Sequence, residues 1–217
     1  MQNPIDIKGR LYSYDEMMWF DELPDHDVEA NIAVCDTADT GRDHLSMPMA
    51  KRIRGKYYIY DWIFTTENMD ITSPLVKGTI QANGLQSVRF ESNNGGKQFA
   101  KDVATETPDC SITWRPTTAN KETRILVDFA WIKLNCVFRK QRVDINGNGI
   151  VDEYHKAIQQ VLSYIKGVKD QKDDAPDSLS MLRRFINELG LNFEQNTNKD
   201  NRSTWESIPI EINQITV

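Results

Sequence analysis

Long apolar runs and paired cysteines are both scarce in this sequence of 217 residues. No stretch approaches the roughly 20 apolar residues that a bilayer-spanning helix needs, and the first residues lack the charged and apolar regions of a signal peptide. The three cysteines, Cys35, Cys110 and Cys136, lie far apart and have no spacing typical of a disulfide framework or a metal site. We therefore expect a soluble protein of a reducing, cytoplasmic compartment.

Positive charge is also in short supply, because 26 Lys and Arg face 32 Asp and Glu and leave a net charge of −6. This balance argues against a protein that coats nucleic acid generally, but a local basic patch on an acidic body is compatible with DNA contact. With 39% hydrophobic residues, the chain can bury one sizeable core. We expect a lead-in linker at residues 1–29, one domain at 30–190 and a C-terminal tail at 191–217.

Strand patterns come first along the chain and then alternate with helical ones. We expect three successive antiparallel strands at 31–36, 44–52 and 56–65, with a hairpin turn around Arg54-Gly55. Further strands are expected at 87–91, 111–114 and 137–139, and helices at 14–20, 73–84, 95–105, 120–135, 151–165 and 178–189. This order predicts an α/β fold, with a mixed sheet of five or six strands and helices on both faces.

Acidic side chains stand at the ends of three of these elements. Asp36 ends the first strand, Glu91 ends the strand at 87–91, and Asp173, Asp174 and Asp177 lie at the start of the last helix. Ligands gather at the carboxyl ends of strands in open sheets, so these acids could meet there. Converging carboxylates need a cation, and all-oxygen ligation suits Mg²⁺ or Mn²⁺. Two such ions could activate a water and steady the leaving oxygen in phosphodiester cleavage.

Structural roles are the alternative for the same acids. Asp36 could be a strand-end turn residue, and Glu91 could cap the helix that starts near Gly95. Asp174 could be the N-cap of the last helix and Asp177 an acid favoured by the helix dipole. Three further acids stay outside the core set. Asp39 and Asp43 are interpreted as turn formers, and Asp61 as either a sheet-edge acid or a neighbour of the site.

Four stretches, in this order and spacing, resemble the nuclease domain of phage terminase large subunits. They are Asp36-Thr-Ala-Asp-Thr-Gly-Arg-Asp43, Tyr57-Tyr-Ile-Tyr-Asp61, Glu91-Ser-Asn-Asn-Gly95 and Asp173-Asp-Ala-Pro-Asp-Ser-Leu179. The resemblance covers roughly residues 30–190 and implies an RNase H-like fold. It also implies a two-metal-ion endonuclease that cuts concatemeric double-stranded phage DNA during genome packaging. Its catalytic and metal-binding residues would be Asp36, Glu91, Asp174 and Asp177, with Asp173 as a neighbouring metal ligand and two Mg²⁺ or Mn²⁺ ions as cofactors.

The resemblance carries expectations about partners as well. It implies double-stranded DNA as substrate, and an ATPase motor, a portal and a small terminase subunit as partners in the host cytoplasm of a phage or prophage. The chain itself has no GxxxxGK[ST] phosphate loop, because Asn94-Gly-Gly-Lys-Gln98 lacks the first glycine and the Ser or Thr. We therefore expect no ATP-driven translocation from this chain.

DNA would need cationic guides near the acidic centre. The candidates cluster on the predicted hairpin and are Arg42, Lys51, Arg52, Arg54 and Lys56; the alternatives are Lys97, Lys101, Arg139, Lys140 and Arg142. Ordinary solvated turn charges are the other interpretation of each of them.

One motif competes with a nuclease site. Asp144-Ile-Asn-Gly-Asn-Gly149 matches the opening of an EF-hand calcium loop, but His155 occupies the position of the usual bidentate Glu. We favour a Gly/Asn turn here. Two alternatives to the terminase-type nuclease stay open: a Holliday-junction resolvase or transposase-like enzyme of the same fold, and a non-catalytic calcium-binding or interaction module.

Overall fold

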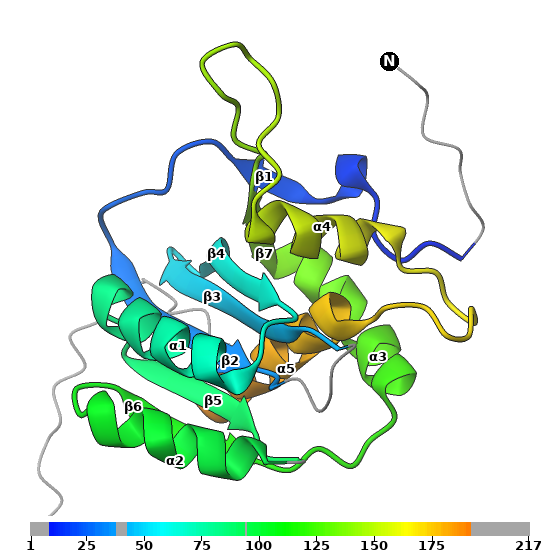
Figure 1. Cartoon of the computed structure of the whole chain (residues 1–217). Coiled ribbons are helices and arrows are strands. Elements are labelled where there is room, and N and C mark those ends of the chain that lie inside the picture. Colours follow the sequence, from blue (N-terminus) through cyan, green and yellow to red (C-terminus); the bar gives the residue numbers. More distant parts are fainter. Residues whose placement is uncertain (1–8, 38–42, 94, 192–217) are drawn as a thin grey trace, which may run out of the picture.

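The computed structural model describes residues 9–37, 43–93 and 95–191. Seven strands form one sheet in the order β1-β7-β4-β3-β2-β5-β6 (Figure 1). The strands are β1 (Met18–Phe20), β2 (Val28–Cys35), β3 (Leu45–Ile53), β4 (Lys56–Thr65), β5 (Ser87–Glu91), β6 (Ser111–Arg115) and β7 (Cys136–Arg139). The helices are the 3₁₀ turn η1 (Tyr14–Glu16), α1 (Met69–Asn83), α2 (Gly96–Glu106), α3 (Lys121–Asn135), α4 (Glu153–Ser163) and α5 (Asp174–Glu188).

The strand directions bring several carboxyl ends to one edge of the sheet. In the described part of the chain, β3 runs antiparallel to its neighbours β2 and β4, and the remaining strand pairs are parallel. The register of β2 and β5 sets Cys35 opposite Phe90. The next residues along the two strands, Asp36 and Glu91, are therefore neighbours at this edge.

Helices cover both faces of the sheet, as the sequence predicts (Figure 1). α3, α4 and α5 pack over the core cluster that contains Ile32 and Val34, and α1 and α2 pack over the cluster that contains Ala33 and Cys35. Side chains alternate between the faces of a strand. Asp36 continues the series of Ile32 and Val34, so its side chain is directed to the α5 side of the sheet.

The lead-in differs most from expectation. The helix predicted at 14–20 is a single 3₁₀ turn followed by β1, which pairs in parallel with β7. Residues 9–29 are therefore not an irregular linker, because they add one strand to the expected five or six and bury Tyr12 and Phe20 in the core. The domain boundary at residue 30 stays a prediction. Nearly all of the predicted C-terminal tail, residues 192–217, lies outside the described residues.

Two helices begin earlier than predicted. α1 starts at Met69 rather than at Ser73, because the side chain of Asn68 accepts hydrogen bonds from the backbone N–H groups of Asp70 and Ile71 and supplies the cap. α5 starts at Asp174, so the acidic cluster belongs to its first turn. None of the helices in the described ranges has both the length and the apolar character to span a bilayer.

Candidate active site

Asp36 and Glu91 form the centre of the acidic edge, and each residue is 8% exposed. Burial, and after it the charge of Glu91, raises the pKa of Asp36 well above its ordinary value, and the two carboxyl groups are close enough to share a hydrogen bond. The Asn93 side-chain amide donates to Glu91 Oε1 at 2.9 Å and to the carbonyl oxygen of Thr117 at 2.9 Å. Two buried carboxylates in contact repel each other unless a proton or a cation lies between them.

Asp177 reaches this centre from the first turn of α5 and is bound by Arg124 of α3. Arg124 Nε donates to Asp177 Oδ1 at 2.8 Å, and Nη2 donates to Oδ2. Both side chains are buried, with exposures of 0% for Asp177 and 3% for Arg124. Burial raises the pKa of Asp177, whereas the hydrogen bonds and charge of the guanidinium oppose the rise. This pair is a fixed, bidentate ion pair beside the two central carboxylates.

Asp174 and Asp173 border the centre on the side of Lys121, the first residue of α3. Asp174 Oδ2 accepts from the backbone N–H of His44 at 3.2 Å and lies 3.1 Å from His44 Nδ1. Lys121 Nζ lies 3.5 Å from an oxygen of each aspartate. Burial opposes the charge on Lys121, but the carboxylates of Asp36 and of the α5 aspartates raise the pKa of its ammonium group. A lysine therefore balances part of the acidic charge.

Asp36 and Glu91 fit a hard divalent cation, because such a cation prefers carboxylate oxygens as ligands. Both groups are negative when ionised, so a cation is needed to neutralise them. The described residues contain no group of three His, Cys, Asp or Glu side chains already arranged for a metal. The physical reason is that Asp174 and Asp177 are directed to cationic partners rather than to open space. The predicted cage of converging carboxylates is thus only partly assembled.

Neither Asp174 nor Glu91 caps a helix, whereas Asp177 does lie in the first turn of α5. The N-cap of α5 is Asp173 and not Asp174, and its side chain makes no capping hydrogen bond. The N-cap of α2 is Gly95, which has no side chain to cap with, and Glu91 Oε1 accepts from Asn93 instead. Of the acids kept outside the core set, Asp43 is an exposed partner of Lys172 and Asp61 accepts from the backbone N–H of Trp62. Asp39 lies outside the described residues.

Sequence reasoning missed Lys121 and Arg124. They stand three residues apart on the first turn of α3, after the N-cap Asn120, whose side chain accepts from the backbone N–H of Thr123. Positive charge at a helix N-terminus opposes the helix dipole. Two basic residues on one face of a first turn are therefore a signal that acidic groups lie next to that turn.

The described DNA guides predicted on the hairpin lie away from this centre; they are Lys51, Arg52, Arg54 and Lys56. The backbone of Asp36 pairs with Ser46 at the start of β3, whereas Arg54 follows the end of that strand. Eight residues of extended chain separate Ser46 from Arg54, which corresponds to roughly 26 Å. The structure places Arg54 at the end of β3 away from the acidic edge, and the role of the hairpin cations in DNA contact stays a prediction.

Each described hairpin cation also has a partner within the protein. Lys51 lies over the ring of Tyr60, Arg52 pairs with Glu29 at 2.9 Å, Arg54 pairs with Asp27 at 2.8 Å, and Lys56 Nζ donates to the carbonyl oxygen of Leu134 at 2.7 Å. Arg42 lies outside the described residues. Among the alternatives, Lys97 and Lys101 are exposed on α2, Lys140 pairs with Asp21, and Arg139 and Arg142 share Asp152.

The EF-hand-like stretch from Asp144 to Gly149 forms a turn, which is the interpretation favoured from the sequence. Asp144 Oδ1 accepts from the backbone N–H groups of Asn146 and Asn148, each at 2.8 Å, and Asp152 caps α4 by accepting from the backbone N–H of His155. The loop between β7 and α4 projects away from the sheet (Figure 1). Its acids are therefore engaged in turn and cap hydrogen bonds.

Gly96 makes the close approach of α2 to the centre possible. A Cβ atom at this position would lie 2.1 Å from the carbonyl oxygen of Glu91 and 2.7 Å from Thr37 Oγ1. We expect Gly96→Ala to lower the free energy of unfolding by about 1–3 kcal/mol, because the backbone of Glu91 must shift. Urea unfolding measures this change.

Gly78 offers the matched control for that prediction. It lies in α1, and a Cβ atom there meets nothing within 4 Å. Gly78→Ala is expected to leave stability unchanged or raise it by up to about 1 kcal/mol, because alanine favours a helix interior. Equal effects of the two substitutions would contradict the proposed close contact at Gly96.

The fold and its acidic edge define the class of structure to which the chain is similar. The Mn-soaked, inhibitor-bound nuclease domain of human cytomegalovirus terminase matches with a TM-score of 0.55 and 11% identity, over 82% of this chain and 96% of that one. A second Mn-soaked structure of that domain matches with a TM-score of 0.55 and 8% identity, over 79% of this chain and 91% of that one.

A phage terminase is structurally similar to the chain as well. The large terminase of the thermophilic bacteriophage D6E matches with a TM-score of 0.56 and 13% identity, over 81% of this chain and 44% of that one. No family model and no curated protein matches the sequence. The chain therefore has the RNase H-like fold of terminase nuclease domains, as the sequence motifs predict, and it has this fold at very low sequence identity.

Proposed function

We propose that the protein is a metal-dependent endonuclease that cuts double-stranded DNA, of the terminase large-subunit type. One observation carries the proposal: Asp36 and Glu91 lie in contact and buried at the carboxyl ends of two parallel strands, in a fold shared with terminase nuclease domains. Carboxylates arranged in this way are suited to Mg²⁺ or Mn²⁺.

The residues of the proposed site would have different roles in binding the cations. Asp36 and Glu91 would hold the cations, and Asn93 would orient Glu91 through its side-chain amide. We propose Asp174 as the next ligand, because its contact with Lys121 Nζ is long, at 3.5 Å, and can be exchanged for a cation. Asp177 is held by two hydrogen bonds from Arg124, so we assign it first to positioning the start of α5 and second to ligation.

Two neighbouring groups complete the proposed site. Asp173, with Lys121 Nζ at 3.5 Å, would contribute an outer carboxylate. Lys121 would bind these acids before substrate arrives, and its side chain, 40% exposed, could then contact a phosphate. Divalent cations bound at such a site supply an activated water and stabilise the leaving oxygen of the phosphodiester.

The biological setting follows from the similarity and is part of the proposal. Terminase large subunits join a nuclease to an ATPase motor, and this chain spans 44% of the D6E large terminase. We propose that it acts on concatemeric DNA in genome packaging, in the host cytoplasm, together with an ATPase motor, a portal and a small subunit. No ATPase activity is proposed for this chain.

Cleavage of supercoiled plasmid tests the proposed activity. We expect linear product with Mn²⁺ or Mg²⁺, and none with EDTA, because the two central carboxylates need a cation to act on a phosphodiester. Nicked circles without linear product would contradict double-strand cutting and favour another RNase H-like nuclease. Intact plasmid in Mn²⁺ would favour the non-catalytic binding module.

A further inference from the structure

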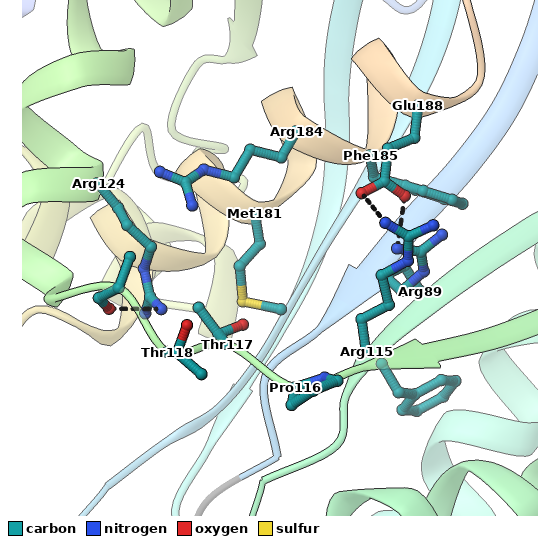
Figure 2. Close-up of a pocket in the computed structure, with 12 residues that line it drawn as sticks. Arg89, Arg115, Pro116, Thr117, Thr118, Arg124, Met181, Arg184, Phe185 and Glu188 are labelled. Carbon is teal, nitrogen blue, oxygen red and sulfur yellow. Dashed lines mark hydrogen bonds and ion pairs between the residues drawn. The ribbon is translucent and has the colours of Figure 1, made fainter.

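A pocket of about 240 Å³ lies beside the acidic centre, on the same face of the sheet. Figure 2 shows Arg89 and Arg115 directed at Glu188, with Thr117, Thr118 and Arg184 around the same space. The walls come from the ends of β5 and β6, the loop after β6, the start of α3 and the outer turns of α5.

Guanidinium groups outnumber carboxylates around the pocket. Glu188 is shared by Arg89 at 2.6 Å and by Arg115 at 3.1 Å. Asp128 is likewise shared by Arg183 and Arg184, both at 3.3 Å. Arg183 and Asp128 lie outside the pocket lining, which carries four guanidinium groups, those of Arg89, Arg115, Arg124 and Arg184, and one carboxylate, that of Glu188. The most exposed of the four are Arg115, at 66%, and Arg184, at 39%.

Three connections tie the pocket to the acidic centre. Arg89 precedes Glu91 by two residues on β5, so both side chains are on the same face and roughly 7 Å apart along the strand. Arg124 lines the pocket and also binds Asp177, and its Nη1 donates to the carbonyl oxygen of Ala119 at 3.1 Å. The Asn93 amide links Glu91 to Thr117 of the pocket wall.

We propose that this pocket, defined by Arg89, Arg115 and Arg184, binds the backbone phosphates of DNA that flank the phosphodiester at the acidic centre. The inference rests on the proposed nuclease function and assigns the strand-binding surface to the pocket instead of the distant hairpin. Arginine forks suit phosphate oxygens, and the hydroxyl groups of Thr117 and Thr118 are further donors of the type that contacts phosphates. Contacts of this kind position DNA without reading its sequence.

DNA affinity measured in EDTA tests the pocket separately from cleavage. The probe is a short fluorescein-labelled duplex, titrated by anisotropy at several salt concentrations with the full chain. We expect Arg115→Ala and Arg184→Ala each to weaken binding about eightfold at about 0.1 M salt, because one lost phosphate contact lowers the salt slope by about 0.9. Arg115→Lys should retain more affinity than Arg115→Ala, since it keeps the charge.

Arg54→Ala is the matched control, because Arg54 is an exposed arginine with a carboxylate partner at the far end of β3. We expect its affinity and salt slope to equal those of the parent. Loss of affinity in Arg54→Ala with unchanged binding by Arg115→Ala and Arg184→Ala would overturn the inference and favour the hairpin. A parent chain that does not bind the duplex would also overturn it. Plasmid cutting in Mn²⁺ reports independently on the nuclease function.

Discussion

Asp36→Asn is expected to lower the rate of Mn²⁺-dependent plasmid cleavage by roughly 10³-fold or more, since it removes a charged ligand from the reacting centre. The substitution keeps the size of the side chain and removes its negative charge. Because Glu91 ends the strand next to that of Asp36 and its charge raises the pKa of the Asp36 carboxyl, Glu91→Gln is expected to cause a loss of similar size. Initial rates of linear-product formation at saturating Mn²⁺ measure both effects.

The matched control for Asp36→Asn is Asp27→Asn. Asp27 is an exposed aspartate that pairs with Arg54 at 2.8 Å, at the end of β3 away from the acidic centre. We expect the parent rate from this variant. Asp36→Asn should also unfold at a higher temperature than the parent in EDTA, because it removes a buried carboxylate that Glu91 repels. Cleavage at the parent rate by a folded Asp36→Asn protein would remove Asp36 from the proposed site.

Arg124→Ala is expected to lower the free energy of unfolding by about 3–5 kcal/mol, because it leaves the buried carboxylate of Asp177 without its partner. The pair is buried on both sides, so solvent screens it little. Arg54→Ala provides the comparison, because the pair of Arg54 with Asp27 is exposed and is expected to contribute less than about 1 kcal/mol. Urea unfolding at neutral pH measures both variants.

A double variant separates the ion pair from the general loss of packing. In Arg124→Met with Asp177→Leu, no charge is left buried, and we expect most of the lost stability to return. A double variant as unstable as Arg124→Ala would mean that the large side chain of Arg124, and not its charge pairing with Asp177, holds α3 against α5. Cleavage is not informative here, because Asp177 belongs to the proposed site.

Much of the fold follows from local patterns in the sequence. The hairpin of β3 and β4 and the strand β5 were predicted nearly to the residue, because β-branched and aromatic runs there are bounded by clear turn residues. β1 was missed because a strand of three residues has no detectable alternation. Its partner β7 lies more than a hundred residues later in the chain. Pairing at that distance is set by the tertiary fold and not by local propensity.

The acidic centre was predictable only in part. The strand-end positions of Asp36 and Glu91 indicated that they could meet, since parallel neighbouring strands end at one edge. The orientation of Asp174 and Asp177 depended on Lys121 and Arg124, which come from a helix that the sequence does not connect with α5. The hairpin was expected to carry cationic guides near the acidic centre, whereas β3 carries Lys51, Arg52 and Arg54 away from Asp36, a displacement that local sequence patterns do not reveal.

The proposed metal centre between Asp36 and Glu91 is tested most directly by the anomalous diffraction of manganese in crystals of this chain soaked with Mn²⁺. We expect a peak within about 2.5 Å of an oxygen of Asp36 and of an oxygen of Glu91. We also expect this peak to disappear in Asp36→Asn crystals treated in the same way. A parent crystal with Mn²⁺ bound only elsewhere, for example at Asp144, and none between Asp36 and Glu91 would contradict the proposed metal centre.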